Sequence, residues 1–302
     1  MNLASLARLL LLSAIWGASF LFMRIGAPVL GPVWLISARV GLAALFLLLV
    51  AGCLGRALQV RRHWRHYAIV GLFNSALPFL LFAYAAQTVS ASLLSILNAT
   101  APIWAALIGH GWLHTPLSAR SALGMVLGLT GVGLLAGIEA AALPGGAALA
   151  ILAGLGAALS YGIATSYTRT APAVEPLANA HGSMWAATLM LAPLLLQAPA
   201  VPAALAPQVI ASVLALGVLC SGVAYLLYFR LIADLGAASA LTVTFLIPLF
   251  GILWGALLLD ERIGWHTVLG GVAILAGTAL VTGLSAPAAW RGARALLGFG
   301  GR

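Results

Sequence analysis

Long apolar stretches separated by short polar joints run along almost the whole chain. Ten of them have the length of about 20 residues at which an α-helix crosses the hydrocarbon core of a bilayer. They lie at residues 6–27, 33–53, 67–87, 91–113, 117–138, 147–168, 177–197, 208–231, 237–258 and 264–284. Proline, glycine or charge marks the joints, as at Gly31-Pro32 and Pro144-Gly145-Gly146. The pattern predicts an all-α integral membrane protein with ten transmembrane helices.

The chain repeats itself at an offset of 146 residues, without a gap. Among the recurring pairs are Gly71 and Gly217, Pro102 and Pro248, Gly124 and Gly270, and Gly131 and Gly277. A looser match at an offset of 145 relates Trp16-Gly17 to Tyr161-Gly162 and Arg24 to Arg169. We therefore predict two five-helix repeats, residues 1–143 and residues 147–302, the second ending in a short basic tail. Duplicated units of this kind are typical of transporters.

The positions of the arginines predict the orientation of the chain. If the N-terminus is cytoplasmic, 11 of the 14 arginines lie inside, Arg24 and Arg262 lie outside, and Arg39 lies within a span. This bias favours two cytoplasmic termini in a bacterial inner membrane. Because five is an odd number of spans, the second repeat is then inverted relative to the first. Inverted repeats allow one central site to be exposed alternately to either side.

The composition agrees with a membrane protein and excludes several other classes. Hydrophobic residues make up 63% of the chain and charged residues 6%, against about 25% charged residues in a soluble domain. The net charge of +9 is explained by orientation, so we expect no nucleic-acid partner. The chain has no lysine, which excludes a Walker A loop and a Schiff-base lysine.

No residue grouping points to a metal, a cofactor or a catalytic centre. Cys53 and Cys220 match no disulfide or zinc spacing. His110 and His114 stand four residues apart, but no Asp, Glu or Cys accompanies them as a further ligand. No HExxH motif, paired mid-span aspartate or Ser/His/Asp grouping is visible. We therefore expect no enzyme, no cofactor and no metal site.

Three prolines lie inside predicted spans, each four residues after a polar residue. The pairs are Pro78 and Asn74, Pro102 and Asn98, and Pro248 and Thr244. Each proline leaves the carbonyl of its partner without the usual helical hydrogen bond. Such carbonyls are tolerated in a membrane where they line a cavity or are satisfied by neighbouring helices. Any single site is explained either by a kink whose polar side chain repairs the helix or by a polar cavity. Because Pro102 and Pro248 are related by the repeat, the three sites together favour a polar cavity.

Aromatic and hydroxyl side chains accompany these positions. The further candidates are Trp16, Phe20, Phe82, Trp104, Tyr161, Ser221, Tyr225 and Tyr228. Aromatic stripes also arise from helix packing and from interfacial belts. However, Trp16, Tyr161 and Tyr225 lie well inside their spans. With the proline sites they predict a pocket for a small amphipathic solute, in which carbonyls receive an ammonium group and rings pack an apolar group.

Charged and titratable residues are scarce inside the spans. No carboxylate falls in the middle of a predicted span, which disfavours a pump that exchanges cations for protons. Arg39 either snorkels outward or meets a substrate carboxylate or a helix end. His181 occupies a roughly comparable place and is either a hydrogen-bonded structural residue or a candidate for proton coupling. We expect Asp260-Glu261 to cap and terminate a helix.

Several of these residues resemble the drug/metabolite transporter superfamily. They are Trp16-Gly17 with Phe20, Arg39, the block from Ala91 to Pro102, and the block from Ala237 to Gly270 with Asp260-Glu261. The EamA-type exporters of this superfamily are most similar, which implies ten helices in two inverted five-helix repeats. Many members carry Gly-Glu after both the fourth and the ninth span, where this chain has His114-Thr115 and Asp260-Glu261. The central aromatic residues are most similar to exporters of aromatic amino acids of the YddG type.

Together these features predict an exporter of amino acids or similar small metabolites that works by alternating access. We expect the substrate between helices 1, 3, 4, 6, 8 and 9, with facilitated efflux or exchange favoured over proton coupling. The alternative is efflux of drug-like or cationic metabolites by proton antiport. The expected partners are the substrate and the lipid bilayer, and the protein acts as a monomer or a homodimer. Glycine and alanine four residues apart, as at Gly124 and Gly128, allow close contacts between repeats or between protomers.

Overall fold

The computed structural model describes residues 3–142, 147–236, 240 and 242–283, and every regular element in these ranges is a helix. In chain order the elements are α1 (Leu3–Cys53), α2 (Val60–Gly71), η1 (Leu72–Ala76), α3 (Leu77–Ala85), α4 (Ala91–Asn98), α5 (Ala101–Leu113), α6 (Ala119–Ala142), α7 (Ala147–Thr170), α8 (Pro176–Leu191), η2 (Ala192–Leu196), α9 (Pro207–Leu214), η3 (Ala215–Val223), α10 (Ala224–Leu235), α12 (Val243–Leu258) and α13 (Trp265–Thr282). The prediction of an all-α fold is confirmed.

Many of these helices are long and apolar enough to cross a membrane. Within the described ranges six helical runs meet that condition: Leu3–Cys53, Val60–Ala85, Ala91–Leu113, Ala147–Thr170, Pro207–Leu235 and Trp265–Thr282. Ala119–Leu135 and Val243–Leu258 are shorter apolar helices. The count of ten spans stays a prediction, as does the side of the membrane on which each end lies. The predicted boundary at Pro144-Gly145-Gly146 and the basic tail fall outside the described residues.

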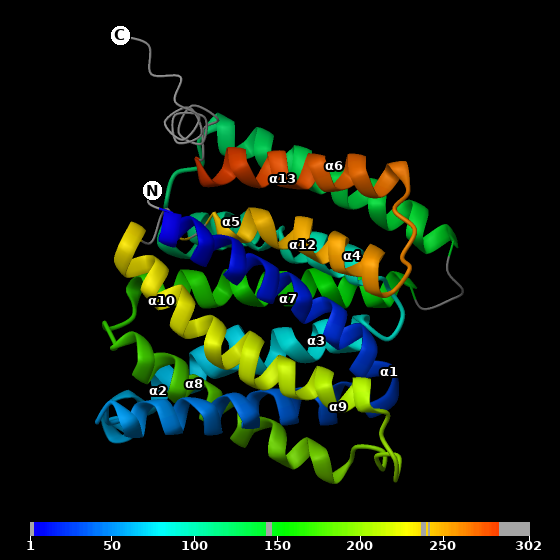
Figure 1. Ribbon diagram of the computed structural model, residues 1–302. Coiled ribbons are helices and arrows are strands. Elements are labelled where there is room, and N and C mark those ends of the chain that lie inside the picture. Colours follow the sequence, from blue (N-terminus) through cyan, green and yellow to red (C-terminus); the bar gives the residue numbers. More distant parts are fainter. Residues whose placement is uncertain (1–2, 143–146, 237–239, 241, 284–302) are drawn as a thin grey trace.

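The first helix folds back on itself at the predicted joint Gly31-Pro32. Gly31 has φ 72° and ψ 160°, a conformation that residues with a Cβ rarely adopt. Residues 3–30 and 32–53 consequently run in opposite directions (Figure 1). The close approach of Gly26 to the Leu35 side chain shows the same reversal, since a Cβ at Gly26 would lie 2.7 Å from it.

The helices form one bundle whose two ends differ in charge. The beginning of α1 and the end of α13 lie at the same end of the bundle (Figure 1). By their places on these helices, that end carries Arg8, Arg61, Arg62, Arg65, Arg120, Arg169 and Arg230. We call it the arginine-rich end. Arg24 and Arg262 belong to the opposite end.

Equivalent glycines of the two halves, residues 3–142 and 147–283, bring α6 and α13 together. A Cβ on Gly124 would lie 2.6 Å from the carbonyl oxygen of Gly277, and a Cβ on Gly131 would lie 2.7 Å from that of Gly270. The offset of 146 residues relates Gly124 to Gly270 and Gly131 to Gly277. The two helices are therefore antiparallel and exchange contacts, as a two-fold axis between equivalent helices requires.

The same exchange of contacts occurs around the centre of the bundle. A Cβ on Gly17 of α1 would lie 2.7 Å from Cβ of Phe250 in α12. A Cβ on Gly162 of α7 would lie 2.9 Å from Cβ of Trp104 in α5. Gly17 corresponds to Gly162, and Trp104 corresponds to Phe250. Each half thus packs its first helix against the fourth helical segment of the other half, and the space between these two contacts holds the site described next.

Candidate functional site

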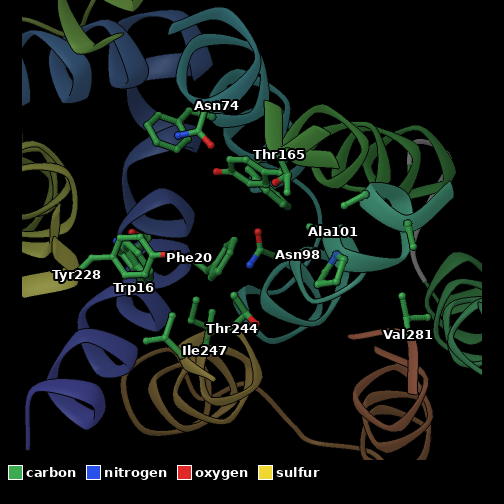
Figure 2. A pocket seen from close by; sticks show the side chains of 18 of the residues that line it. Trp16, Phe20, Asn74, Asn98, Ala101, Thr165, Tyr228, Thr244, Ile247 and Val281 are labelled. Carbon is green, nitrogen blue, oxygen red and sulfur yellow. The ribbon is translucent and has the colours of Figure 1, made fainter. Parts of the chain in front are cut away.

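A cavity of about 510 Å³ lies between the two halves of the chain (Figure 2). All the predicted helices contribute to it, through α1, η1 and α3, α4 and α5, α7, η3 and α10, and α12. Residues also enter from segments outside these six predicted helices: Arg39 from the second part of α1, Thr115, Pro116 and Leu117 from the segment that follows α5, Ser121 from α6 and Val281 from α13. A volume of this size suits a small-molecule ligand, for which pockets measure about 300–1,000 Å³.

Most of the predicted site residues line this cavity. They are Trp16, Phe20, Arg39, Asn74, Phe82, Asn98, Pro102, Tyr161, Tyr225, Tyr228 and Thr244. They come from both halves, and many are separated by more than 100 residues in the sequence. The tertiary structure therefore brings together side chains that belong to different predicted spans.

The remaining candidates lie outside the lining. Pro78 and Pro248 are buried within their helices, and the backbone and Cβ of Trp104 pack against Gly162. Ser221 lies behind Arg39 and accepts its hydrogen bond. His181 is buried, and its Nε2 accepts a hydrogen bond from Trp185 Nε1 at 2.9 Å. This contact fits a hydrogen-bonded structural residue, which was the alternative to a role in proton coupling.

Several lining residues were not among the site candidates, and the repeat offers a signal for them. Adding 146 to Asn74 gives Cys220, and subtracting 146 from Tyr225 gives Phe79. The looser offset of 145 relates Phe20 to Thr165. Ser19 and Met23 continue the helical stripe that begins at Trp16 and Phe20, with spacings of three and seven residues from Trp16.

Aromatic rings form two groups in the lining of the cavity. Trp16 Nε1 donates a hydrogen bond to the carbonyl of Cys220 at 3.1 Å, which fixes the indole. The ring centroid of Trp16 lies 5.3 Å from that of Tyr228 and 6.4 Å from that of Tyr225. On the other side, Phe82 lies 5.4 Å from Phe20 and 6.3 Å from Tyr161. Rings held in this way offer apolar faces without needing to be ordered on binding.

Two asparagine amides, those of Asn74 and Asn98, are among the neutral polar groups that line the cavity. Asn74 Nδ2 lies 3.3 Å from the Tyr225 hydroxyl, to which it donates. The amide of Asn98 points into the middle of the cavity (Figure 2). Asn98 is the last residue of α4, and α5 begins at Ala101 with Pro102 in its second position. The carbonyl of Ala99 in this break accepts a hydrogen bond from Thr278 Oγ1 at 2.8 Å, so α13 satisfies one backbone acceptor of the break.

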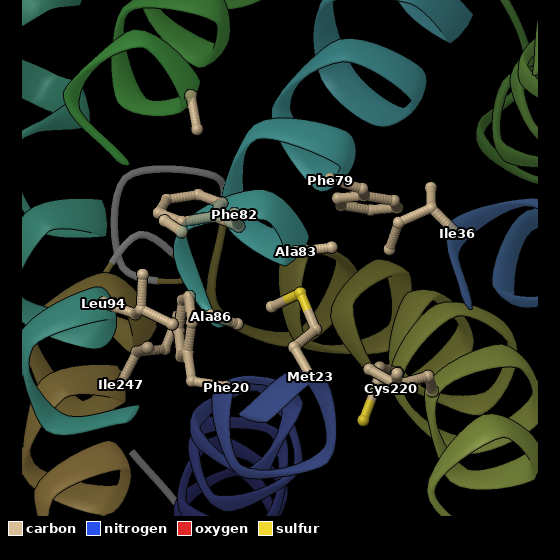
Figure 3. Packing of buried hydrophobic residues seen from close by; sticks show 14 of the residues in the cluster. Phe20, Met23, Ile36, Phe79, Phe82, Ala83, Ala86, Leu94, Cys220 and Ile247 are labelled. Carbon is tan, nitrogen blue, oxygen red and sulfur yellow. The ribbon is translucent and has the colours of Figure 1, made fainter. Parts of the chain in front are cut away.

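The cavity reaches the surface at the arginine-rich end. There its lining includes Thr115, Thr165 and Arg169, which are exposed. Toward the opposite end the cavity is closed by a cluster of buried side chains, among them Met23, Ala83, Ala86 and Leu94 (Figure 3). The site is therefore accessible from one side only.

Two polar contacts hold the opposite end shut. Arg24 Nη1 donates to the carbonyls of Ala86 at 2.8 Å and Gln87 at 3.0 Å, at the end of α3. The Glu261 carboxylate accepts from the backbone N–H groups of Ala91 at 2.6 Å and Ser92 at 3.0 Å. A carboxylate at the first N–H groups of a helix is stabilised by unpaired donors and by the helix dipole. The expected capping role of Glu261 is confirmed, although the capped helix is α4 and not the one that Glu261 follows.

The equivalent residues at the arginine-rich end make no such closure. The counterpart of Arg24 is Arg169, which is exposed at the mouth of the cavity. The counterpart of Glu261 is Thr115, which lines the same mouth and carries no charge. The repeated unit is thus present in a closed arrangement at one end and an open arrangement at the other.

Comparison with known proteins identifies the family. The family model described as the EamA-like transporter family matches residues 4–137 and, a second time, residues 148–283. This chain belongs to the EamA-like transporter family. It is therefore a multi-pass membrane protein of a transporter family, and the resemblance to EamA-type proteins is confirmed.

Other EamA-like transporters are similar over nearly their full length. A protein of Bacillus subtilis (strain 168) named uncharacterized transporter YoaV is 26% identical over 270 residues, which cover 87% of this chain and 91% of the relative. An uncharacterized transporter of Archaeoglobus fulgidus is 26% identical over 289 residues, covering 93% and 98% of the two chains. One solved crystal structure is similar in fold, with a TM-score of 0.61 and 16% sequence identity. The match covers 95% of this chain and 99% of the chain in that structure, and it supports the fold alone.

Proposed function

We propose that this EamA-like transporter exports amino acids, including aromatic ones, or similar small metabolites. The observation that carries the proposal is the central cavity, with rings on its walls and the amide of Asn98 directed into its middle (Figure 2). An amino acid fits this lining, because its side chain packs against the rings and its amino and carboxylate groups form hydrogen bonds with amides.

We propose alternating access as the mechanism, supported by the two arrangements of the repeated unit. If the halves exchange arrangements, Arg169 adopts the contacts that Arg24 makes, and the opposite end opens as the arginine-rich end closes. The exchanged glycine contacts are the geometry expected of inverted repeats. Because arginine marks the cytoplasmic side, we assign the open end to the cytoplasm of a bacterial inner membrane.

Efflux from reconstituted vesicles tests the proposal. Proteoliposomes containing the full chain are loaded with labelled phenylalanine or leucine, and release is followed with and without a pH gradient. We expect release down the gradient and exchange against external amino acid, with little dependence on pH. Empty liposomes and Asn98→Trp, which fills the cavity, serve as controls. Transport of a lipophilic cation such as tetraphenylphosphonium in place of amino acids contradicts the proposal.

A further inference from the structure

Arg39 is a charged side chain held at the centre of the protein. It is 4% exposed and belongs to the second part of α1. Its Nε donates to Ser221 Oγ at 2.9 Å, and its guanidinium carbon lies 3.6 Å from the centroid of the Phe79 ring. Nη1 lies 3.8 Å from Met23 Sδ, a weak acceptor. All these neighbours are neutral, so the positive charge is held in place but not neutralised.

The described carboxylates that form polar contacts do so near helix ends, away from Arg39. Glu175 accepts from the backbone N–H of Ala178 at the start of α8. Asp234 forms ion pairs with Arg8 and Arg230. Glu261 caps α4. A guanidinium stays protonated in proteins, and a buried ion without a counter-charge is destabilised by several kcal/mol.

The cavity lies directly beside this charge. Arg39 is one of the residues that line it, whereas its packing counterpart in the second half is an uncharged serine. This correspondence follows from the glycines, since a Cβ on Gly217 would lie 3.2 Å from the Arg39 carbonyl and one on Gly71 would lie 2.8 Å from the Ser183 carbonyl. At this position only the first half, residues 3–142, therefore places a positively charged side chain beside the cavity.

We infer that Arg39 is the anion-binding group of the site and receives the carboxylate of the substrate. Its terminal nitrogens match the two oxygens of a carboxylate, and a charge-assisted pair of this kind is strong in a site shielded from water. The apolar part of the substrate then packs against the rings of Trp16 and Phe82. This inference rests on the proposed function and narrows it to carboxylate-bearing solutes, because Arg39 repels a solute that is only cationic.

Matched pairs of ligands test the inference on the purified full chain. Phenylalanine and leucine are compared with 2-phenylethylamine and 3-methylbutylamine, which lack only the carboxylate, and 3-phenylpropionate lacks only the ammonium. Binding is measured as the rise in the midpoint of thermal unfolding, because a ligand of the folded state raises it. We expect the three carboxylates to raise the midpoint and the two amines to leave it unchanged.

Variants then assign the effect to Arg39. Arg39→Gln is expected to weaken carboxylate binding roughly 10- to 100-fold, the range for loss of a charge-assisted hydrogen-bonded pair. Arg65→Gln, an exposed arginine on α2, is the matched control and is expected to bind as the wild type does. If Arg39→Gln does not fold, the comparison of amines with carboxylates on the wild-type protein decides whether the site binds a carboxylate.

The outcomes separate this inference from the proposed function. Equal binding of amines and carboxylates by the wild type, no binding of carboxylates, or unchanged binding by Arg39→Gln overturns the role of Arg39. Amino-acid efflux that persists in those cases leaves the proposed function standing. Conversely, Arg39-dependent carboxylate binding without efflux from vesicles supports the anion site and overturns the exporter.

Discussion

At the scale of single residues, the site combines fixed rings with one amide, that of Asn98, which is directed at the cavity. Trp16 is tied to the Cys220 carbonyl, and Asn74 is tied to the Tyr225 hydroxyl. Asn98 differs, because its amide is directed at the cavity, while in the neighbouring break the Ala99 carbonyl accepts a hydrogen bond from Thr278. Loss of the Asn98 side chain should therefore affect the ligand more than the fold.

Asn98→Ala tests this distinction. We expect the apparent affinity for a transported amino acid to fall roughly 3- to 10-fold, the worth of one neutral hydrogen bond. The midpoint of thermal unfolding should stay close to that of the wild type, because the amide faces the cavity. Gln197→Ala, which removes an exposed amide outside the lining, is the control. A large loss of stability without loss of affinity contradicts the assignment.

At the scale of elements, helix contacts depend on glycines that leave no room for a side chain. Gly124 of α6 approaches the Gly277 carbonyl of α13, whereas Gly133 on the same helix has no atom within 4 Å of the position of a Cβ. One helix therefore carries both a packing glycine and a glycine in open space. Small residues at such contacts are what allow membrane helices to approach closely.

Gly124→Ala and Gly133→Ala form a matched pair on α6. We expect Gly124→Ala to lower the free energy of unfolding by about 1–3 kcal/mol, because the new Cβ meets the Gly277 carbonyl. Gly133→Ala should leave it unchanged or raise it by up to about 1 kcal/mol through helix propensity. Thermal unfolding in detergent measures both. Equal effects of the two changes would show that α6 does not pack on α13 through Gly124.

Helix capping at the closed end links α4 to the segment that follows α12. Glu261 and Glu175 both cap a helix, but Glu175 caps α8 from the residue directly before it. Glu261 instead joins two elements far apart in sequence and so closes the opposite end. Loss of the Glu261 cap and loss of the Glu175 cap should therefore lower stability to a similar extent, but only loss of the Glu261 cap should open the cavity from the opposite end.

Glu261→Gln and Glu175→Gln separate capping from closure. Each should destabilise the protein by about 0.3–2 kcal/mol, the range for a negative charge at a helix N-terminus. Only Glu261→Gln should speed the labelling of Met23→Cys by a membrane-impermeant thiol reagent added at the opposite end. The test uses a background in which Cys53 and Cys220 are replaced by serine. Identical labelling in the two variants would remove Glu261 from the closure.

At the scale of the whole molecule, the proposed alternating access treats the two halves as one unit in two arrangements. The contacts of Arg24 with Ala86 and Gln87 define the closed state. Their counterparts at an offset of 146 are the carbonyls of Ile232 and Ala233, which Arg169 should reach when the arginine-rich end closes. Under the proposed alternating access, the closed end therefore serves as the template for a closed arginine-rich end.

Cross-linking between Arg169→Cys and Ala233→Cys tests that conformation. We expect a short bifunctional thiol reagent to join the two cysteines slowly in the absence of substrate and faster during transport, and to block efflux once they are joined. Arg24→Cys with Gln87→Cys is the matched pair and should react readily in the present conformation. Continued turnover without any reaction between positions 169 and 233 would contradict an exchange of arrangements.

Much of the fold was readable from the sequence because the bilayer imposes simple rules. Apolar length predicted helical segments such as Ala91–Leu113 and Ala147–Thr170, and Gly31-Pro32 predicted the reversal within α1. The repeat predicts which glycines are equivalent, and these glycines lie against one another between α6 and α13. These properties depend on local length, backbone chemistry and offset, all of which are written along the chain.

The direction in which each side chain points was decided by tertiary structure alone. In a helix that is apolar all round, sequence periodicity does not separate lipid-facing from cavity-facing positions, because lipid and protein interior favour the same residues. Pro102 therefore lines the cavity while its counterpart Pro248 does not, and His181 faces Trp185. Likewise, only the packing of distant segments places Arg39 beside the cavity with neutral neighbours, and closes one end through Glu261 while Thr115 leaves the other open.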